Sequence, residues 1–286
     1  MAPPQRHRAE WHGVERHSGQ RERIGDGHHG GHERDGGRPA RRGGRDAVHG
    51  VRPWPDGPHR QRREGVHRRR ARQRHRRREG GVRPSRQAWE RIEPIAGLVE
   101  DIDVAVDARV DDFESEDDPA WTGWHKLEYL VYDVGDIGPE SGATELADQL
   151  DADLATLQET MTSTDIPAAA IPVGASELIE EVSGGKLTGE EDRYSGTDLW
   201  DIAANVDGSH AAFETLEGAV EAKDPELVER IEAGFEDADE LIEKYEDGDG
   251  YQSFDELTEE DSDAFKTTLG SLAEDLALVS GVLGLE

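Results

Sequence analysis

The sequence of 286 residues contains no cysteine and no apolar run long enough to cross a membrane. Without cysteine there can be no disulfide, no thiolate metal site and no cysteine nucleophile. A membrane-spanning helix needs about 18–20 consecutive apolar residues, and no such run is present. The first residues, MAPPQRHRAE, also lack the apolar stretch of a signal peptide, so none is expected.

The first 86 residues lack leucine, phenylalanine, tyrosine, lysine, asparagine and threonine altogether. They hold 24 arginines, 10 histidines and 10 acidic residues, which gives a net charge of +14. A segment without leucine or phenylalanine cannot bury enough apolar surface to offset the entropy lost when its backbone is ordered. We therefore expect residues 1–85 to be an unstructured segment rich in arginine, histidine and glycine. The folded domain is expected to occupy residues 86–286.

Two origins are compatible with this arginine-rich segment. A genuine basic arm would attract phosphate groups and indicate a nucleic-acid partner. The absence of lysine beside so many arginines, and the abrupt change of composition, instead favour translation of a GC-rich gene in the wrong frame. The true frame would then resume between Pro84 and Arg86. We favour this second origin, and therefore expect no nucleic-acid partner.

From residue 87 onward the composition is reversed, with 55 acidic and nine basic residues and a net charge of −46. A surface this acidic keeps a protein hydrated and dispersed in concentrated salt, where screening removes much of the self-repulsion. The charge therefore predicts a halophilic source rather than a specific cationic partner.

Apolar residues of this acidic segment recur at the spacing of amphipathic helices. Asp224 followed by Pro225, a Thr188–Glu191 capping box and Thr258 are typical helix starts. No short segment alternates apolar and polar residues as a strand would. The pattern predicts helices near residues 86–113 (bent at Pro94), 120–133, 142–162, 173–183, 189–222, 225–246 and 259–283.

Seven helices with short connections exceed what one four-helix bundle needs. Long amphipathic helices joined by short loops bury their apolar faces as antiparallel bundles. The predicted fold is therefore all-α, with two packed antiparallel four-helix bundles divided near residues 167–172.

Only two histidines follow residue 86, and His125 is the more informative of them. Glu128 follows it by three residues, so both side chains share one helix face and can converge on an ion. Mixed nitrogen and oxygen ligands suit zinc or iron. Spacing alone nevertheless favours a simpler arrangement, in which His125 packs beside Trp121 and Trp124 and Glu128 is solvated. The second histidine, His210, is expected in the core or at its boundary.

Several sequence strings resemble the imelysin-like domain of EfeO-type iron-uptake proteins. The strings are RQAWERIEPIA, DIDVAVDAR, WTGWHKLE, GEEDRYSGTDLWD and LAEDLALVSGVLGLE, and the resemblance extends over residues 86–286. It implies an all-α fold of two four-helix bundles. It also implies an extracytoplasmic protein, periplasmic or at the cell surface, that binds iron and works with a membrane iron permease and other uptake components. The expected ion is Fe²⁺ or Fe³⁺, with zinc and copper as alternatives.

The resemblance also indicates metal-site residues. The GxHxxE motif, the presumed metal site of the family, corresponds to Gly123, His125 and Glu128. The acidic position of the TDLWD motif corresponds to Asp198.

Two positions depart from the family pattern. Val110 stands where an acid usually follows DAR, and Gly196 stands where YSHTDL has histidine. Asp111 is a nearby substitute for the missing acid, although one residue along a helix turns a side chain by about 100°. The lost donors predict a weaker site or an altered metal preference.

Two other functions remain open. One is an imelysin-type metallopeptidase, but a zinc peptidase usually has three protein ligands and a general-base glutamate, often in HExxH. The sequence HKLE supplies one histidine and one glutamate, so we assign no catalytic residue. The other is a helical interaction module whose metal site has decayed.

Overall fold

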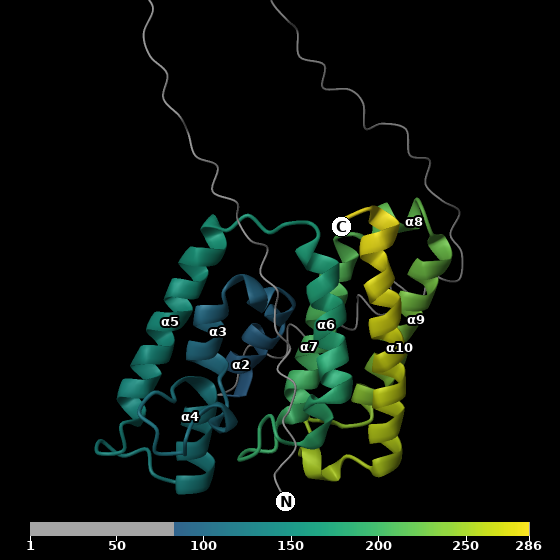
Figure 1. Cartoon of the computed structure of the whole chain (residues 1–286). Coiled ribbons are helices and arrows are strands. Elements are labelled where there is room, and N and C mark those ends of the chain that lie inside the picture. Colours follow the sequence, from purple (N-terminus) through teal and green to yellow (C-terminus); the bar gives the residue numbers. More distant parts are fainter. Residues whose placement is uncertain (1–82, 286) are drawn as a thin grey trace, which may run out of the picture. The chain divides into compact units, whose positions relative to one another are not determined.

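The computed structural model describes residues 83–285, and their regular structure is almost entirely helical (Figure 1). The predicted all-α class is confirmed. The helices are α2 (Arg83–Glu90), α3 (Glu100–Asp107), α4 (Gly123–Tyr129), α5 (Ala143–Ser163), α6 (Ala170–Gly184), α7 (Asp198–Glu214), α8 (Glu217–Glu221), α9 (Pro225–Glu243) and α10 (Glu259–Leu283). The predictions for residues 1–82, including their wrong-frame origin, lie outside the described residues. Among the residues described, no helix combines the length and the apolar character that crossing a membrane requires.

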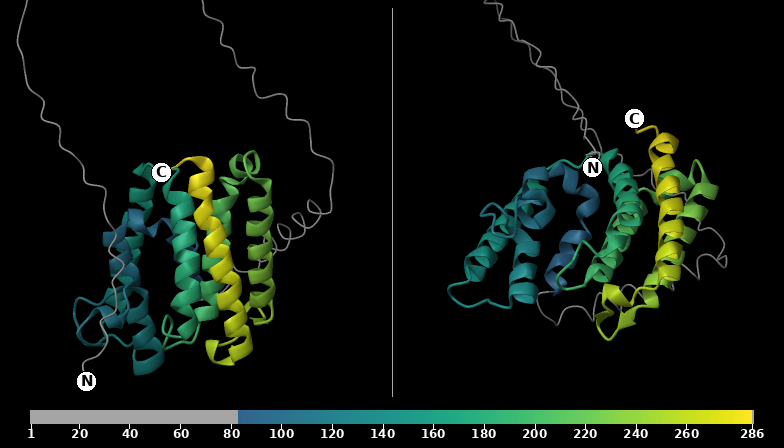
Figure 2. Two further views of the ribbon diagram at one scale, coloured as in Figure 1. Left: turned by 45° about the vertical axis from the view of Figure 1, so that its right-hand side comes forward. Right: turned by 60° about the horizontal axis from the view of Figure 1, so that its bottom comes forward.

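The four longest helices of the C-terminal part pack around one apolar core. Helices α6, α7, α9 and α10 each touch two neighbours of this group, and they lie side by side in both figures (Figures 1 and 2). Phe213, Phe235 and Phe265 are fully buried between them. Two predicted caps are confirmed, because Asp224 accepts the Leu227 amide and Thr258 accepts the Asp261 amide.

A second, smaller core lies in the N-terminal part of the described chain. It is enclosed by α2, the 3₁₀ turn η2 (Glu93–Leu98) and helices α3, α4 and α5. Trp89, Val106 and Trp124 are buried there, together with Leu150 and Leu157 from α5. The described residues thus contain two cores, but their division into two complete four-helix bundles stays a prediction.

Two predicted helices are shorter than the apolar pattern indicated. The helix expected over 86–113 is interrupted: α2 ends at Glu90, and the 3₁₀ turn η2, with Pro94 as its second residue, precedes α3. Pro94 has no amide hydrogen with which to continue the helix. The helix expected over 189–222 begins only at Asp198. Thr188 ends a 3₁₀ turn, η5 (Lys186–Thr188), and Gly189 has a left-handed φ of 73°, so the predicted capping box is wrong.

Several short elements of the described chain are not α-helical. One is the 3₁₀ turn η3 (Val110–Asp112), and another is the π-helical turn η4 (Leu130–Val134) after α4. A two-residue ladder pairs β1 (Glu246–Asp247) with β2 (Gly250–Tyr251), where no strand was expected, and the turn η6 (Phe254–Glu256) follows it. The segment 189–197 matters most, because it supplies side chains to the site.

Candidate metal centre

The first residue of α4 brings that helix against the end of α3. Gly123 has a left-handed φ of 81°, and a Cβ at this position would collide with the carbonyl oxygen of Val106. Only glycine allows such an approach without strain. Thr122 strengthens the contact by donating its hydroxyl hydrogen to the Ala105 carbonyl, at 3.0 Å. As a result His125, two residues into α4, lies beside Asp107, the last residue of α3.

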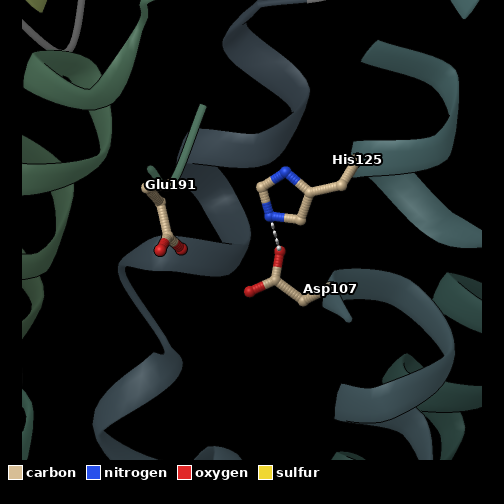
Figure 3. A group of neighbouring side chains, drawn as sticks. All are labelled: Asp107, His125 and Glu191. Atoms are coloured by element: carbon tan, nitrogen blue, oxygen red, sulfur yellow. Dashed lines mark ion pairs between the residues drawn. The ribbon is translucent and has the colours of Figure 1, made fainter. Parts of the chain in front are cut away.

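His125 is the central side chain of the site and is only 2% exposed. Its Nε2 lies 3.6 Å from Asp107 Oδ1, and neither atom has a hydrogen-bond partner within residues 83–285. Its Nδ1 lies 3.3 Å from Glu128 Oε2 and 3.8 Å from Asp192 Oδ1. Figure 3 shows the His125 ring facing the Asp107 carboxylate, with the Glu191 carboxylate to one side.

Two groups of three side chains could each hold an ion. One is Asp107, His125 and Glu191, and the other is His125, Glu128 and Asp192. In each group the candidate ligand atoms lie within 4.8 Å of one another. Ligands at about 2.0–2.2 Å from a shared ion are roughly 3–3.5 Å apart, so a small inward movement would suffice. Both groups use His125: Asp107 lies near its Nε2, whereas Glu128 and Asp192 lie near its Nδ1.

The segment 189–197 supplies two of the carboxylates from outside any helix. The Gly196 amide donates to the Asp192 carbonyl at 2.7 Å, and the Gly196 carbonyl accepts the Phe254 amide at 2.9 Å. Glu128 Oε1 accepts the amides of Tyr194 and Ser195, at 3.0 and 2.8 Å. These bonds fasten the segment to α4, so Glu191 and Asp192 face His125.

Gly196 occupies the position where the resemblance implied a histidine. Its φ is 65°, and a Cβ there would lie 2.8 Å from Ser253 Oγ. A histidine in this backbone conformation would be strained. The segment 189–197 therefore lies against the site but lacks the nitrogen ligand that a histidine at position 196 would supply.

Three cations compensate part of the negative charge, and two of them, Arg86 and Lys186, are buried. Arg86 pairs with five carboxylates at 2.9–3.3 Å, while Lys186 and Arg109 pair with Glu191 at 3.4 and 2.9 Å. The Arg86 partners are Glu90, Asp107, Glu191, Asp192 and Asp201. The carboxyl groups outnumber these cations, and burial raises the pKa of Asp107 and of Asp201 well above the usual range.

Burial and neighbouring charges shift the ionisation of the site. Burial, helped by the Arg86 charge, holds the pKa of His125 well below its usual range, so the imidazole is neutral and keeps a lone pair for a metal. Burial and the nearby Asp192 carboxylate raise the pKa of Glu128 to about 7. The same two causes raise the pKa of Asp198 to about 6. Burial opposes the charge of Glu191, but Lys186 and Arg86 outweigh it and lower that pKa.

The family model described as Imelysin matches residues 83–279. The chain belongs to the imelysin family. Proteins named iron uptake system component EfeO, from Escherichia coli O157:H7, Escherichia coli K12 and Shigella flexneri, are each 44% identical to it over 204 residues. The matched region covers 71% of this chain and 54% of each relative. The chain therefore spans about half the length of the curated relatives it matches.

The imelysin fold brings two of the four predicted ligands together. His125 and Glu128 face each other, and the Glu128 side chain is 9% exposed, so the alternative with a solvated glutamate is wrong. Asp198 is buried and its Oδ1 accepts the Asp192 amide at 3.2 Å, so it borders the site through Asp192. Asp111 is 58% exposed and pairs with Arg193. The ligand roles of these four residues stay predictions, because Asp198 and Asp111 fall outside both three-residue groups.

Sequence reasoning missed Asp107, Glu191 and Asp192 as site residues of this imelysin domain. They lie in DAR and GEEDR, strings that the family resemblance had already marked. Each string contains an arginine, and basic residues are rare in this segment, which has only nine. These arginines were a usable signal that the acidic residues beside them belong to a buried charged cluster. His210, expected in the core, is buried there and stacks on Phe235 with the ring centres 4.3 Å apart.

Proposed function

We propose that this imelysin domain binds iron as the extracytoplasmic component of an uptake system and passes it to a membrane permease. The observation that carries the proposal is the pair formed by His125 Nε2 and Asp107 Oδ1. Both atoms are buried, lie 3.6 Å apart and have no hydrogen-bond partner among the residues described. Buried polar atoms without partners are unfavourable, so an ion between them would relieve that cost.

The ion would bind at the group formed by Asp107, His125 and Glu191. Glu128 faces the opposite ring nitrogen at 3.3 Å and would accept its hydrogen. That bond would hold the ring in the tautomer whose Nε2 lone pair points at Asp107 and Glu191. The second group, His125 with Glu128 and Asp192, is the alternative position, and it retains Glu128 as a direct ligand.

The donor set suits a hard or borderline ion. Two carboxylates and one imidazole are ligands that iron and zinc accept, and copper binds imidazole as well. Three protein donors leave coordination positions for water. An ion with few protein ligands is released more readily, as a carrier protein requires.

The comparisons support the biological part of the proposal. The relatives carry the name iron uptake system component, which supports an iron-uptake role in partnership with other components. Delivery outside the cytoplasm and transfer to a permease are parts of the proposal that need their own test. Growth of an iron-uptake mutant under iron limitation, restored by the wild-type chain only when a permease is present, would provide it.

Titration of the full chain with Fe²⁺ under anaerobic conditions tests the binding itself, and we expect one ion per chain. Asp107→Asn and Glu128→Gln separate the two positions, because the first should weaken binding more if the ion lies at Nε2. An equal or larger loss in Glu128→Gln would move the ion to the second group. Cleavage of casein by the loaded chain would indicate a peptidase instead, and absence of binding would indicate a decayed site.

A further inference from the structure

The Arg86 guanidinium contacts the same oxygen atoms that an ion would need. One terminal nitrogen lies 3.0 Å from Asp107 Oδ1 and 3.0 Å from Glu191 Oε1. The other lies 3.3 Å from Asp192 Oδ1. Asp107 Oδ1 also lies 3.6 Å from His125 Nε2, and Asp192 Oδ1 lies 3.8 Å from His125 Nδ1. Both candidate groups therefore include oxygens that already face a cation.

We propose that Arg86 is a built-in competitor of the metal ion, which neutralises the ligand carboxylates in the empty site and limits the affinity of the loaded one. The inference rests on the proposed function. It assigns Arg86 a part in setting how readily the cargo is released, and it does not make Arg86 a ligand.

Without a metal ion, the site needs a positive charge such as that of Arg86. Carboxylates gathered in a buried space repel one another, and without a cation they would take up protons or separate. The Asp107 Oδ1 contact with Arg86 is an ion pair that lacks hydrogen-bond geometry. This oxygen is therefore compensated in charge but still unsatisfied, and a metal ion can attract it more strongly.

When an ion is bound, the positive charge of Arg86 repels it. An arginine keeps its proton at any physiological pH, so it cannot become neutral when an ion arrives, as a lysine could. Arg86 also forms ion pairs with Glu90 at 2.9 Å and with Asp201 at 3.2 Å. Neither of these residues belongs to the two three-residue metal groups. It would stay in place while the ligand oxygens turn toward the ion, and the two cations would repel each other.

Two other cations of the site provide matched controls. Arg109 contacts Glu191 through Oε2 at 2.9 Å and is 37% exposed. Lys186 contacts Glu191 at 3.4 Å and otherwise pairs with Glu90 and Glu93. Within the described chain, neither forms an ion pair with Asp107 or Asp192, so removing either charge should affect the ion less than removing Arg86.

The test is a competition titration of the full chain with Zn²⁺ and Fe²⁺ against a chelator of known affinity. Arg86→Met should bind the ion on the order of tenfold more tightly than wild type, because one unit charge near the site is removed. Arg109→Met should change the affinity by less than about threefold. Without metal, Arg86→Met should melt at a lower temperature, and metal should raise its melting temperature more than that of wild type.

Chemical rescue separates competition from a merely structural role. In Arg86→Ala, free guanidinium at millimolar concentration should re-enter the space and lower the metal affinity toward the wild-type value. Sodium chloride at the same ionic strength should not lower the metal affinity of Arg86→Ala. Neither salt should change the metal affinity of wild type. A folded Arg86→Met or Arg86→Ala that binds metal no more tightly than wild type would overturn the proposal.

If both variants fail to fold without metal, Arg86→Lys decides the question. It keeps the charge but loses the planar fork that reaches several oxygens at once, so its affinity should lie above that of wild type. Equal or weaker binding in Arg86→Lys would contradict competition. The proposed function fails separately, when wild type itself binds no ion.

Discussion

His125 Nε2 and Asp107 Oδ1 face each other at 3.6 Å in a buried space, with no hydrogen bond made by either atom within the described residues. They come from two helices joined by an irregular connection, α4 and α3, and the close contact at Gly123 sets their separation. Two polar atoms at this distance, neither with a hydrogen bond, match the spacing of neighbouring ligands around a metal ion.

Gly123→Ala should destabilise the domain and weaken metal binding together. The added methyl group meets the Val106 carbonyl, and the left-handed backbone is unfavourable for alanine, so we expect a loss on the order of 2–4 kcal/mol. Urea unfolding measures it. Gly270→Ala in α10 is the control, because no heavy atom of the described chain outside its own helix backbone lies within 4 Å of the added Cβ. That control should be neutral or stabilising by about 1 kcal/mol; equal losses in both variants would contradict the packing argument.

Glu128 should make the metal-free domain less stable as pH rises from about 4.5 to about 7. Its pKa is raised to about 7 in the folded chain, so folding favours the protonated carboxyl. The associated stability is complete below the unfolded value of 4.5 and is lost as pH passes the folded value, with a size on the order of 2–3 kcal/mol. Urea unfolding at several pH values gives the slope.

Glu128→Gln should flatten that slope, because its amide does not titrate. Asp198→Asn should flatten only the lower part of the range, since the pKa of Asp198 is raised to about 6 from 3.8. Bound metal should also abolish the slope if Glu128 is a ligand or accepts the His125 hydrogen. A slope that persists unchanged in Glu128→Gln would show that other groups cause it.

Local features of the sequence predicted much of the fold. The α10 stripe from Phe265 to Val279 is buried as expected, because helical spacing alone decides which residues share a face. The Asp224 cap was also predictable, since its bond to Leu227 joins residues three apart. His125 and Glu128 meet for the same local reason.

The rest of the site depends on packing between distant segments. Arg86 and Glu191 are 105 residues apart in sequence yet hydrogen-bonded. Among 55 acidic residues, no spacing rule marks Glu191 or Asp107 as special. The break at 91–99 was foreseen only as a bend at Pro94, and the break at 189–197 was missed because GEEDRYSGT resembles the capped start of a helix.

Lys186→Met should strongly destabilise the domain, although it should change metal affinity less than Arg86→Met does. Lys186 is buried and pairs with Glu90 at 3.2 Å and Glu93 at 2.9 Å, so its removal leaves buried carboxylates uncompensated. Breaking a buried ion pair costs about 3–5 kcal/mol. Lys266→Met is the control, since Lys266 is half exposed and lies 3.9 Å from Asp263. It should change the free energy of unfolding by less than about 0.5 kcal/mol.

Salt should stabilise the domain. Residues 87–286 carry a net charge of −46, and screening reduces their mutual repulsion. The melting temperature should therefore rise as KCl increases from dilute buffer to molar concentrations. A melting temperature that falls or stays level over this range would count against the predicted halophilic source.

The central claim is that His125 holds the ion. Its most direct test is anaerobic Fe²⁺ titration of the full chain beside His125→Ala and His210→Ala, with helicity checked by circular dichroism. His210 is the matched control, because it is equally buried but pairs with Glu232, outside both three-residue metal groups. We predict one ion per chain for wild type and His210→Ala, and no stoichiometric binding for His125→Ala with helicity intact. Unchanged binding in His125→Ala would contradict the account.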